Sequence, residues 1–157
     1  MTTLPIAQTF RRKGHWIGPA GVCTLDYAAR FLRRKRLLTA EGEAFIVDLP
    51  QTTSLDHGDA LVLTDGRLVA IHAAAEALLA ITGRELARLA WHIGNRHTPC
   101  QIKSDRLLIQ NDSVIGHMLE HLGATVTQIN APFTPEGGAY GHGRTHSHEH
   151  GATAHDH

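Results

Sequence analysis

The first seventy residues alternate short apolar runs with turn-forming residues, which is typical of β-structure. The run EAFIVDL over 43–49 is closed by Pro50, and two further apolar runs, 59–63 and 67–71, flank Asp65-Gly66. Asp-Gly between runs of this kind is a strong hairpin signal, because both residues tolerate the positive φ angles of a tight turn. The pattern therefore predicts an all-β segment at the start of the chain.

The periodicity then changes. The run EALLAI over 76–81 predicts another strand, and the T-x-x-E form of a helix capping box follows it at Thr82 to Glu85. Apolar residues next recur three and four positions apart, which predicts a helix over 83–93. Gly94-Asn95 would end this helix, because both residues tolerate a left-handed backbone.

The following segment repeats the alternation of strand and helix. Two short strands, 100–103 and 106–110, come before a second helix that Asp112 caps at its start and Gly123 ends. A final strand, TVTQI, covers 125–129. The order β-α-β-β-α-β is that of the ferredoxin-like fold, with one antiparallel four-stranded sheet and both helices on one face.

These elements divide the chain into three segments and place it in the α+β class. We expect an all-β domain over 1–72, a ferredoxin-like domain over 73–140 and a tail over 141–157. The tail contains no Val, Ile, Leu, Met, Phe or Trp. Without large apolar residues it has too little surface to bury to offset its conformational entropy, so we expect it to be disordered.

Composition excludes several classes of protein. The net charge is zero with His neutral, so no global field attracts nucleic acid or a membrane surface. The start of the chain lacks the apolar centre of a signal peptide, and no apolar run approaches ~18 residues, so we expect a cytoplasmic protein without a membrane span. Cys23 and Cys100 are too few for a disulfide framework.

A local basic run interrupts this even charge pattern, with five cations within seven residues: Arg30, Arg33, Arg34, Lys35 and Arg36. Charges on a solvated face or edge of a strand discourage aggregation, which is the favoured interpretation. The alternative is a docking surface for an acidic partner.

Histidines dominate the end of the chain. Six of the thirteen are His142, His146, His148, His150, His155 and His157. The unperturbed imidazole pKa is ~6.5, so most free rings are neutral at pH 7 and can bind Ni, Cu, Zn or Co. An expression tag would be an uninterrupted His run, whereas Gly, Ser, Thr, Glu and Asp separate these residues. We therefore interpret the tail as a transition-metal binder.

Internal histidines offer two further possibilities. His97 follows the predicted stop of the first helix, where an exposed ring can act as a ligand, and a two-fold dimer would place two copies about one metal. His117 to His121 reads H-x-x-E-H, the inverted zinc-protease motif. Because no suitable third ligand follows it, we interpret this helix face as solvated, with a weak accessory metal site as the alternative.

No motif indicates an enzyme. The chain has no P-loop, no G-x-G-x-x-G and no G-x-S-x-G. Cys100 lies close to His97 in sequence, but no third group completes a nucleophilic site, so we interpret Cys100 as a packed thiol. We therefore expect no catalytic residue.

The stretch WHIGNRHTPCQI over 91–102 carries a specific signature: an aromatic residue, then H-h-G-N-R-H-x-P-x-Q, where h is apolar. With DSVIGHMLEHLGATV over 112–126 and PFTPEGGAYGHG over 132–143, the chain resembles the urease accessory protein E family, the nickel metallochaperones. The likeness covers nearly the whole chain, but the specific motifs lie within 91–141.

The resemblance implies a homodimeric carrier with two domains. The first would be similar to a co-chaperone peptide-binding domain, and the second would bind metal and dimerise. His97 would bind nickel at the two-fold axis, with a tail histidine completing the site. The Ni(II) cargo would pass to the urease accessory GTPase (UreG) of the urease maturation complex.

Two features of the sequence bear on which metals and sites this chain would use. Asn111 and Ser113 stand where some members carry an H-x-H pair, so we expect no second site there. Imidazoles alone would also bind Zn(II) or Cu(II). A passive His-rich metal buffer without a client is the alternative function.

Overall fold

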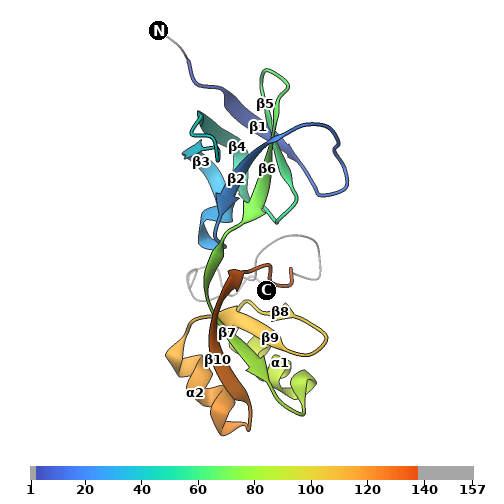
Figure 1. Cartoon of the computed structure of the whole chain (residues 1–157), viewed down its shortest axis with the longest axis vertical. Coiled ribbons are helices and arrows are strands. Elements are labelled where there is room, and N and C mark those ends of the chain that lie inside the picture. Colours follow the sequence, from blue (N-terminus) through green and yellow to red (C-terminus); the bar gives the residue numbers. More distant parts are fainter. Residues whose placement is uncertain (1–2, 138–157) are drawn as a thin grey trace. The chain divides into compact units, whose positions relative to one another are not determined.

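The computed structural model describes residues 3–137, and the chain divides into two compact units (Figure 1). The first unit is Met1–Ala74 and the second is Ala75–His157. No described helix is long and apolar enough to cross a membrane. The expected disordered tail lies outside the described residues.

The first unit is a six-stranded sheet in the order β2-β6-β5-β1-β4-β3. Its elements are β1 (Ile6–Arg11), β2 (Gly21–Leu25), the 3-10 helix η1 (Ala28–Arg30), β3 (Phe31–Leu38), β4 (Ala44–Ser54), β5 (Ala60–Leu63) and β6 (Leu68–Ala73). The expected β-rich start of the chain is confirmed. The predicted hairpin is present too, since β5 pairs antiparallel with β6 and Gly66 adopts a φ of 92° in the turn between them.

The two edges of this sheet approach each other near the β3–β4 turn. The Ala40 N–H donates to the Val22 carbonyl on β2 at 2.7 Å. The Cys23 thiol donates to the Leu38 carbonyl at the end of β3, with sulfur and oxygen 3.3 Å apart. The curled sheet encloses one aliphatic core that includes the fully buried Val47 and Leu61.

Pro50 does not end its strand as the sequence predicted. β4 continues through it to Ser54, and the pairing with β3 shifts at this place: Arg34 is opposite Asp48, whereas Leu32 is opposite Thr53. The extra residues on β4 form a bulge. Proline lacks a backbone N–H, and a bulge is one of the places in a sheet where that donor is not needed.

The basic run is not one surface. Arg33, Arg34, Lys35 and Arg36 are exposed on β3, which is an edge strand, so the predicted location on a strand edge is confirmed. Arg30 is fully buried instead. Its Nε donates to the Leu55 carbonyl at 3.1 Å and its guanidinium also donates to the Leu25 carbonyl at 3.0 Å, so it joins η1 to the end of β4 and β2.

The second unit has the predicted element order. β7 (Ala75–Thr82), α1 (Leu86–Asn95), β8 (Gln101–Ile102), β9 (Leu107–Gln110), α2 (Ser113–His121) and β10 (Thr125–Pro132) follow one another. The strands form an antiparallel sheet in the order β10-β7-β9-β8. This is the strand order of the ferredoxin-like fold. Leu79, Ile81, Leu89, Ile93 and Leu119 belong to its buried core.

The two helices begin differently. Asp112 caps α2 as predicted, since its Oδ1 accepts the backbone N–H groups of Val114 and Ile115. The predicted capping box of α1 is wrong. Thr82 is the last residue of β7 and pairs with Thr125, and Glu85 precedes the helix without a side-chain capping bond. Pairing in the sheet therefore outweighs the local T-x-x-E signal.

Candidate metal centre

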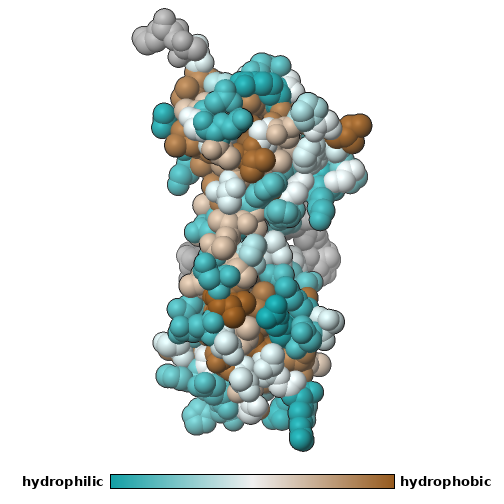
Figure 2. All heavy atoms as spheres, viewed as in Figure 1, coloured by the Kyte–Doolittle hydropathy of each residue, from teal (hydrophilic) through white to brown (hydrophobic). Residues whose placement is uncertain are grey.

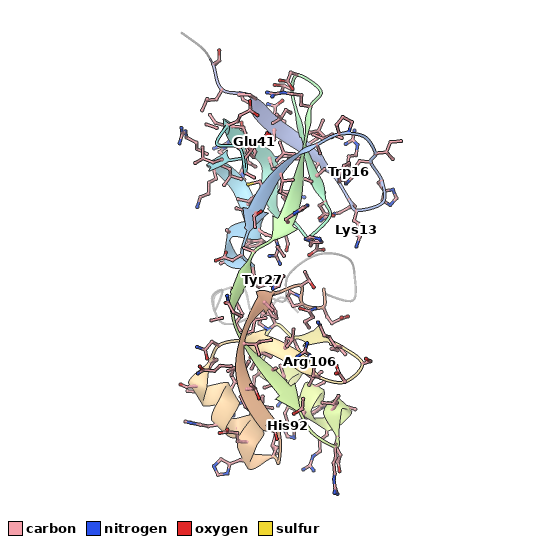
Figure 3. All side chains as sticks on the ribbon, viewed as in Figure 1. Lys13, Trp16, Tyr27, Glu41, His92 and Arg106 are labelled. Carbon is pink, nitrogen blue, oxygen red and sulfur yellow. The ribbon has the colours of Figure 1, made fainter. Side chains whose placement is uncertain are left out.

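The last turn of α1 presents an aromatic residue and a histidine to the surface. The helix buries Leu89 and Ile93, while Trp91 is 63% exposed. The Trp91 indole meets the His92 ring edge-on, with ring centroids 5.0 Å apart. His92, labelled in Figure 3, is half-buried. This contact gives His92 a packing role beside Trp91.

His97 ends the helix in a left-handed conformation. Its φ is 58°, and it is the one residue other than glycine with a positive φ in the described part of the chain. The His97 N–H donates to the Gly94 carbonyl at 2.9 Å, and the Thr98 N–H donates to the Ile93 carbonyl at 3.3 Å. These two bonds define a Schellman motif, in which the left-handed position satisfies the last helical carbonyls. The predicted stop at Gly94-Asn95 is thus wrong, since both residues lie within α1.

The second helix shows what usually occupies this position. α2 ends in the same pair of bonds, from Gly123 to the Glu120 carbonyl and from Ala124 to the Leu119 carbonyl, both at 3.0 Å. Its left-handed residue is Gly123, with a φ of 94°. A left-handed residue with a Cβ costs roughly 1–2 kcal/mol. Because strained residues cluster at functional sites, the histidine in this position is a functional candidate.

The His97 ring is free to bind a ligand. The residue is exposed, and its side chain makes no hydrogen bond or ion pair with any residue from 3 to 137. Imidazole supplies one coordination bond to a transition metal, so this residue needs further ligands from outside the turn.

A segment after β10 returns to the start of β8, a few residues after this turn in the sequence. The Thr134 N–H donates to the Gln101 Oε1 at 2.9 Å, and the Glu136 N–H donates to the Cys100 carbonyl at 2.8 Å. Phe133 at the start of this segment is fully buried. The segment is therefore attached at Cys100 and Gln101, and Cys100 comes three positions after His97 in the sequence.

Cys100 is a packed thiol in the metal-free protein. The thiol is half-buried and packs against the core of the second unit. Burial and the nearby Glu136 carboxylate raise its pKa to about 11. The thiol stays protonated at neutral pH, so the prediction of a packed thiol is confirmed.

Family models match both units of the chain. The model described as the UreE urease accessory protein, N-terminal domain, matches residues 6–74, and the one for the C-terminal domain matches residues 74–157. The chain belongs to the UreE family. The expected family resemblance is therefore confirmed.

Relatives within the UreE family are similar over most of their length. The urease accessory protein UreE of Ruegeria pomeroyi is 61% identical over 94% of this chain and 99% of its own. The UreE of Cereibacter sphaeroides is 57% identical, over 96% of this chain and 83% of its own. The UreE of Paracoccus denitrificans is 60% identical over 77% of each.

The other candidate ligands of this UreE family member are dispersed. His117 and His121 are exposed on α2, away from the His97 turn in sequence and on another element. Asn111 follows β9, and Ser113 is the first residue of α2. Between residues 3 and 137, no group of three or more His, Cys, Asp or Glu converges. The six tail histidines (His142, His146, His148, His150, His155 and His157) lie outside the described residues.

Sequence reasoning missed two features of the site. The left-handed conformation of His97 had no local signal, because the neighbouring Gly94-Asn95 is the more usual stop. The packing of segment 133–136, within the expected domain over 73–140, was not predicted. The large apolar Phe133 between two prolines was the one sign that this segment packs on the second unit.

Proposed function

We propose that this protein is a nickel metallochaperone that delivers Ni(II) for assembly of the urease active site. Membership of a family of urease accessory proteins supports the urease connection. The observation that carries the metal assignment is His97, an exposed imidazole held in a strained left-handed turn where the equivalent turn of α2 has glycine. The proposed role is that of a carrier, with no catalytic residue.

A homodimer through the second unit would complete the site. One His97 offers a single bond, whereas a two-fold axis beside the turn brings two rings to one ion. Exposed Trp91 on α1 and Ile102 on β8, 63% and 54% exposed, belong to the elements on either side of the turn. Aromatic and apolar residues are enriched at the centres of interfaces, which supports contact between two copies here.

The tail would supply further ligands. The Glu136 N–H donates to the Cys100 carbonyl, and His142 comes six positions after Glu136. At ~3.3–3.6 Å per residue this segment spans up to about 20 Å. His142 is therefore within reach of the His97 turn of the same chain, and tethering raises the effective concentration of imidazole there. His146, His148, His150, His155 and His157 would recruit additional ions.

The ligand set suits transfer of the cargo. Two His97 rings with tail imidazoles and water can reach the five or six positions that Ni(II) accepts, whereas Zn(II) is usually four-coordinate. Imidazole affinity alone would favour Cu(II) over Ni(II), so Cu(II) and Zn(II) would also bind. Selection of nickel would come from metal supply and from docking to the urease accessory GTPase (UreG) in the maturation complex. This transfer would take place in the cytoplasm.

Calorimetry of Ni(II) binding at neutral pH tests the role of His97. We expect His97→Gly to abolish the tightest site, with one ion per dimer, because glycine keeps the left-handed turn and removes only the ring. His92→Ala is the matched control and should retain that site. Unchanged tight binding in His97→Gly would overturn the assignment.

A passive buffer is the competing function, since the tail alone can sequester ions. It requires neither a defined interface site nor a partner. Capture of the purified urease accessory GTPase by the full chain, measured with and without Ni(II), distinguishes the carrier from the buffer. Nickel-dependent capture that His97→Gly weakens supports delivery, whereas no capture under either condition supports the buffer.

A further inference from the structure

The outer face of α2 has a set of polar side chains that neither the core nor the proposed nickel site uses. The helix buries Ile115, Gly116 and Leu119. His117, Glu120 and His121 are exposed on the other side. These residues carry the H-x-x-E-H pattern, and nothing in the proposed function at His97 accounts for them.

We propose that His117 and His121 form a second, bidentate site for a divalent transition-metal ion. Residues four positions apart on a helix have Cβ atoms roughly 5–6 Å apart and point the same way. Two histidines at this spacing are the arrangement with which a helix holds zinc in H-E-x-x-H. Imidazole selects Ni(II), Cu(II) or Zn(II) over Mg(II) or Ca(II).

The electrostatics of this part of α2 favour a cation. His121 is the last residue of the helix, where the aligned peptide dipoles leave a partial negative charge of about half an electron. Segment 111–126 contains no Lys or Arg. The exposed Glu120 carboxylate beside His121 adds negative charge, so no neighbour in this segment repels a metal ion.

The backbone that carries the two rings is fixed at both ends. Asp112 caps the start of α2 with two hydrogen bonds, and Gly123 closes its last turn. Leu119, between the two histidines, is fully buried. A Cβ on Gly116 would come within 3.2 Å of the Leu79 side chain, which shows how closely the helix packs on β7. Binding would therefore order only the two side chains, whereas histidines that are not held on a helix would also need their backbone to be ordered.

The site would be exchangeable. No third His, Cys, Asp or Glu converges with these two rings among residues 3–137. Water would fill the remaining positions on the ion, leaving them open to another ligand. Acid would release the metal, because protons compete with it for the coordinating nitrogen of each imidazole.

Histidine-specific modification of the full chain tests the proposal. Diethyl pyrocarbonate modifies free imidazoles, and mass spectrometry locates each modified residue. With Ni(II) as the probe, we expect His117 and His121 to become protected together. In His117→Ala, the Ni(II) concentration that half-protects His121 should rise at least tenfold, because a chelate becomes a single ligand. Glu120→Gln removes a nearby charge but no ligand, so it should shift this concentration far less than His117→Ala does.

One outcome contradicts the proposal, and a second variant and an internal control exclude other causes. Equal protection of His121 in the wild type and in His117→Ala would overturn the proposal, since the rings would then bind independently. His117→Gln, which keeps helix propensity, excludes loss of α2 as the cause and should reproduce the alanine result. His97 is read in the same spectra, so failure of the nickel site there is seen separately from failure on α2.

Discussion

At the scale of single residues, His97 combines a conformational penalty with an exposed imidazole. The Schellman turn needs a left-handed residue, and Gly123 meets that need in α2 without strain. A histidine in the same position is destabilising for the fold. Its presence is explained if the turn serves to hold the ring in a defined orientation at the surface, which is what a shared site between two copies requires.

This argument predicts opposite effects of exchanging the two residues. His97→Gly should stabilise the metal-free protein by about 1 kcal/mol, because relief of left-handed strain exceeds the added entropy of glycine in the unfolded chain. Gly123→His should destabilise it by a similar amount. Urea unfolding, followed by Trp91 fluorescence in a Trp16→Phe background, measures both. Destabilisation by His97→Gly would contradict the strain account.

At the scale of elements, the sequence predicted those features that residues close together in the chain determine. The hairpin at Asp65-Gly66, the Asp112 cap and the order of the second unit follow from turn chemistry and periodicity, and the structure confirms them. Local signals failed where a partner distant in sequence decides. Thr82 pairs with β10 instead of capping α1, and Pro50 lies in a bulge opposite β3.

The site was predictable to a similar degree. The family signature made His97 a candidate ligand, and that role stays a prediction. Its left-handed turn and the return of residues 133–136 to Cys100 depend on tertiary contacts. No periodic pattern encodes either contact. The basic run shows the same limit, because two arginines three positions apart have opposite environments: Arg30 is buried and Arg33 is exposed on β3.

That contrast gives a prediction for the first unit. Arg30→Ala should destabilise it by about 3 kcal/mol, because the buried carbonyls of Leu25 and Leu55 lose charged donors. Arg33→Ala, three residues away, should change stability by less than about 0.5 kcal/mol. Urea unfolding monitored by Trp16 in a Trp91→Phe background reports on this unit. Equal effects of the two changes would refute the assignment of separate roles.

At the scale of the whole molecule, a fixed site and a source of extra ligands would be joined by the 133–136 segment. Its bonds to Gln101 and Cys100 anchor the chain three to four positions after His97 in the sequence, before the tail histidines begin. On this basis the two parts contribute differently. His97 would determine where the tight ion binds, and the tail histidines would determine how many ions the dimer carries.

Truncation after Gly141 separates these contributions. It removes all six tail histidines and leaves His97, the Schellman turn and the anchoring bonds of Thr134 and Glu136 in place. We expect the number of Ni(II) ions bound per dimer to fall while the one-per-dimer site that depends on His97 persists, as measured by calorimetry and by metal analysis after dialysis. Combining the truncation with His97→Gly should then abolish that remaining tight site. If truncation alone eliminated tight binding, the tail and not His97 would define the site.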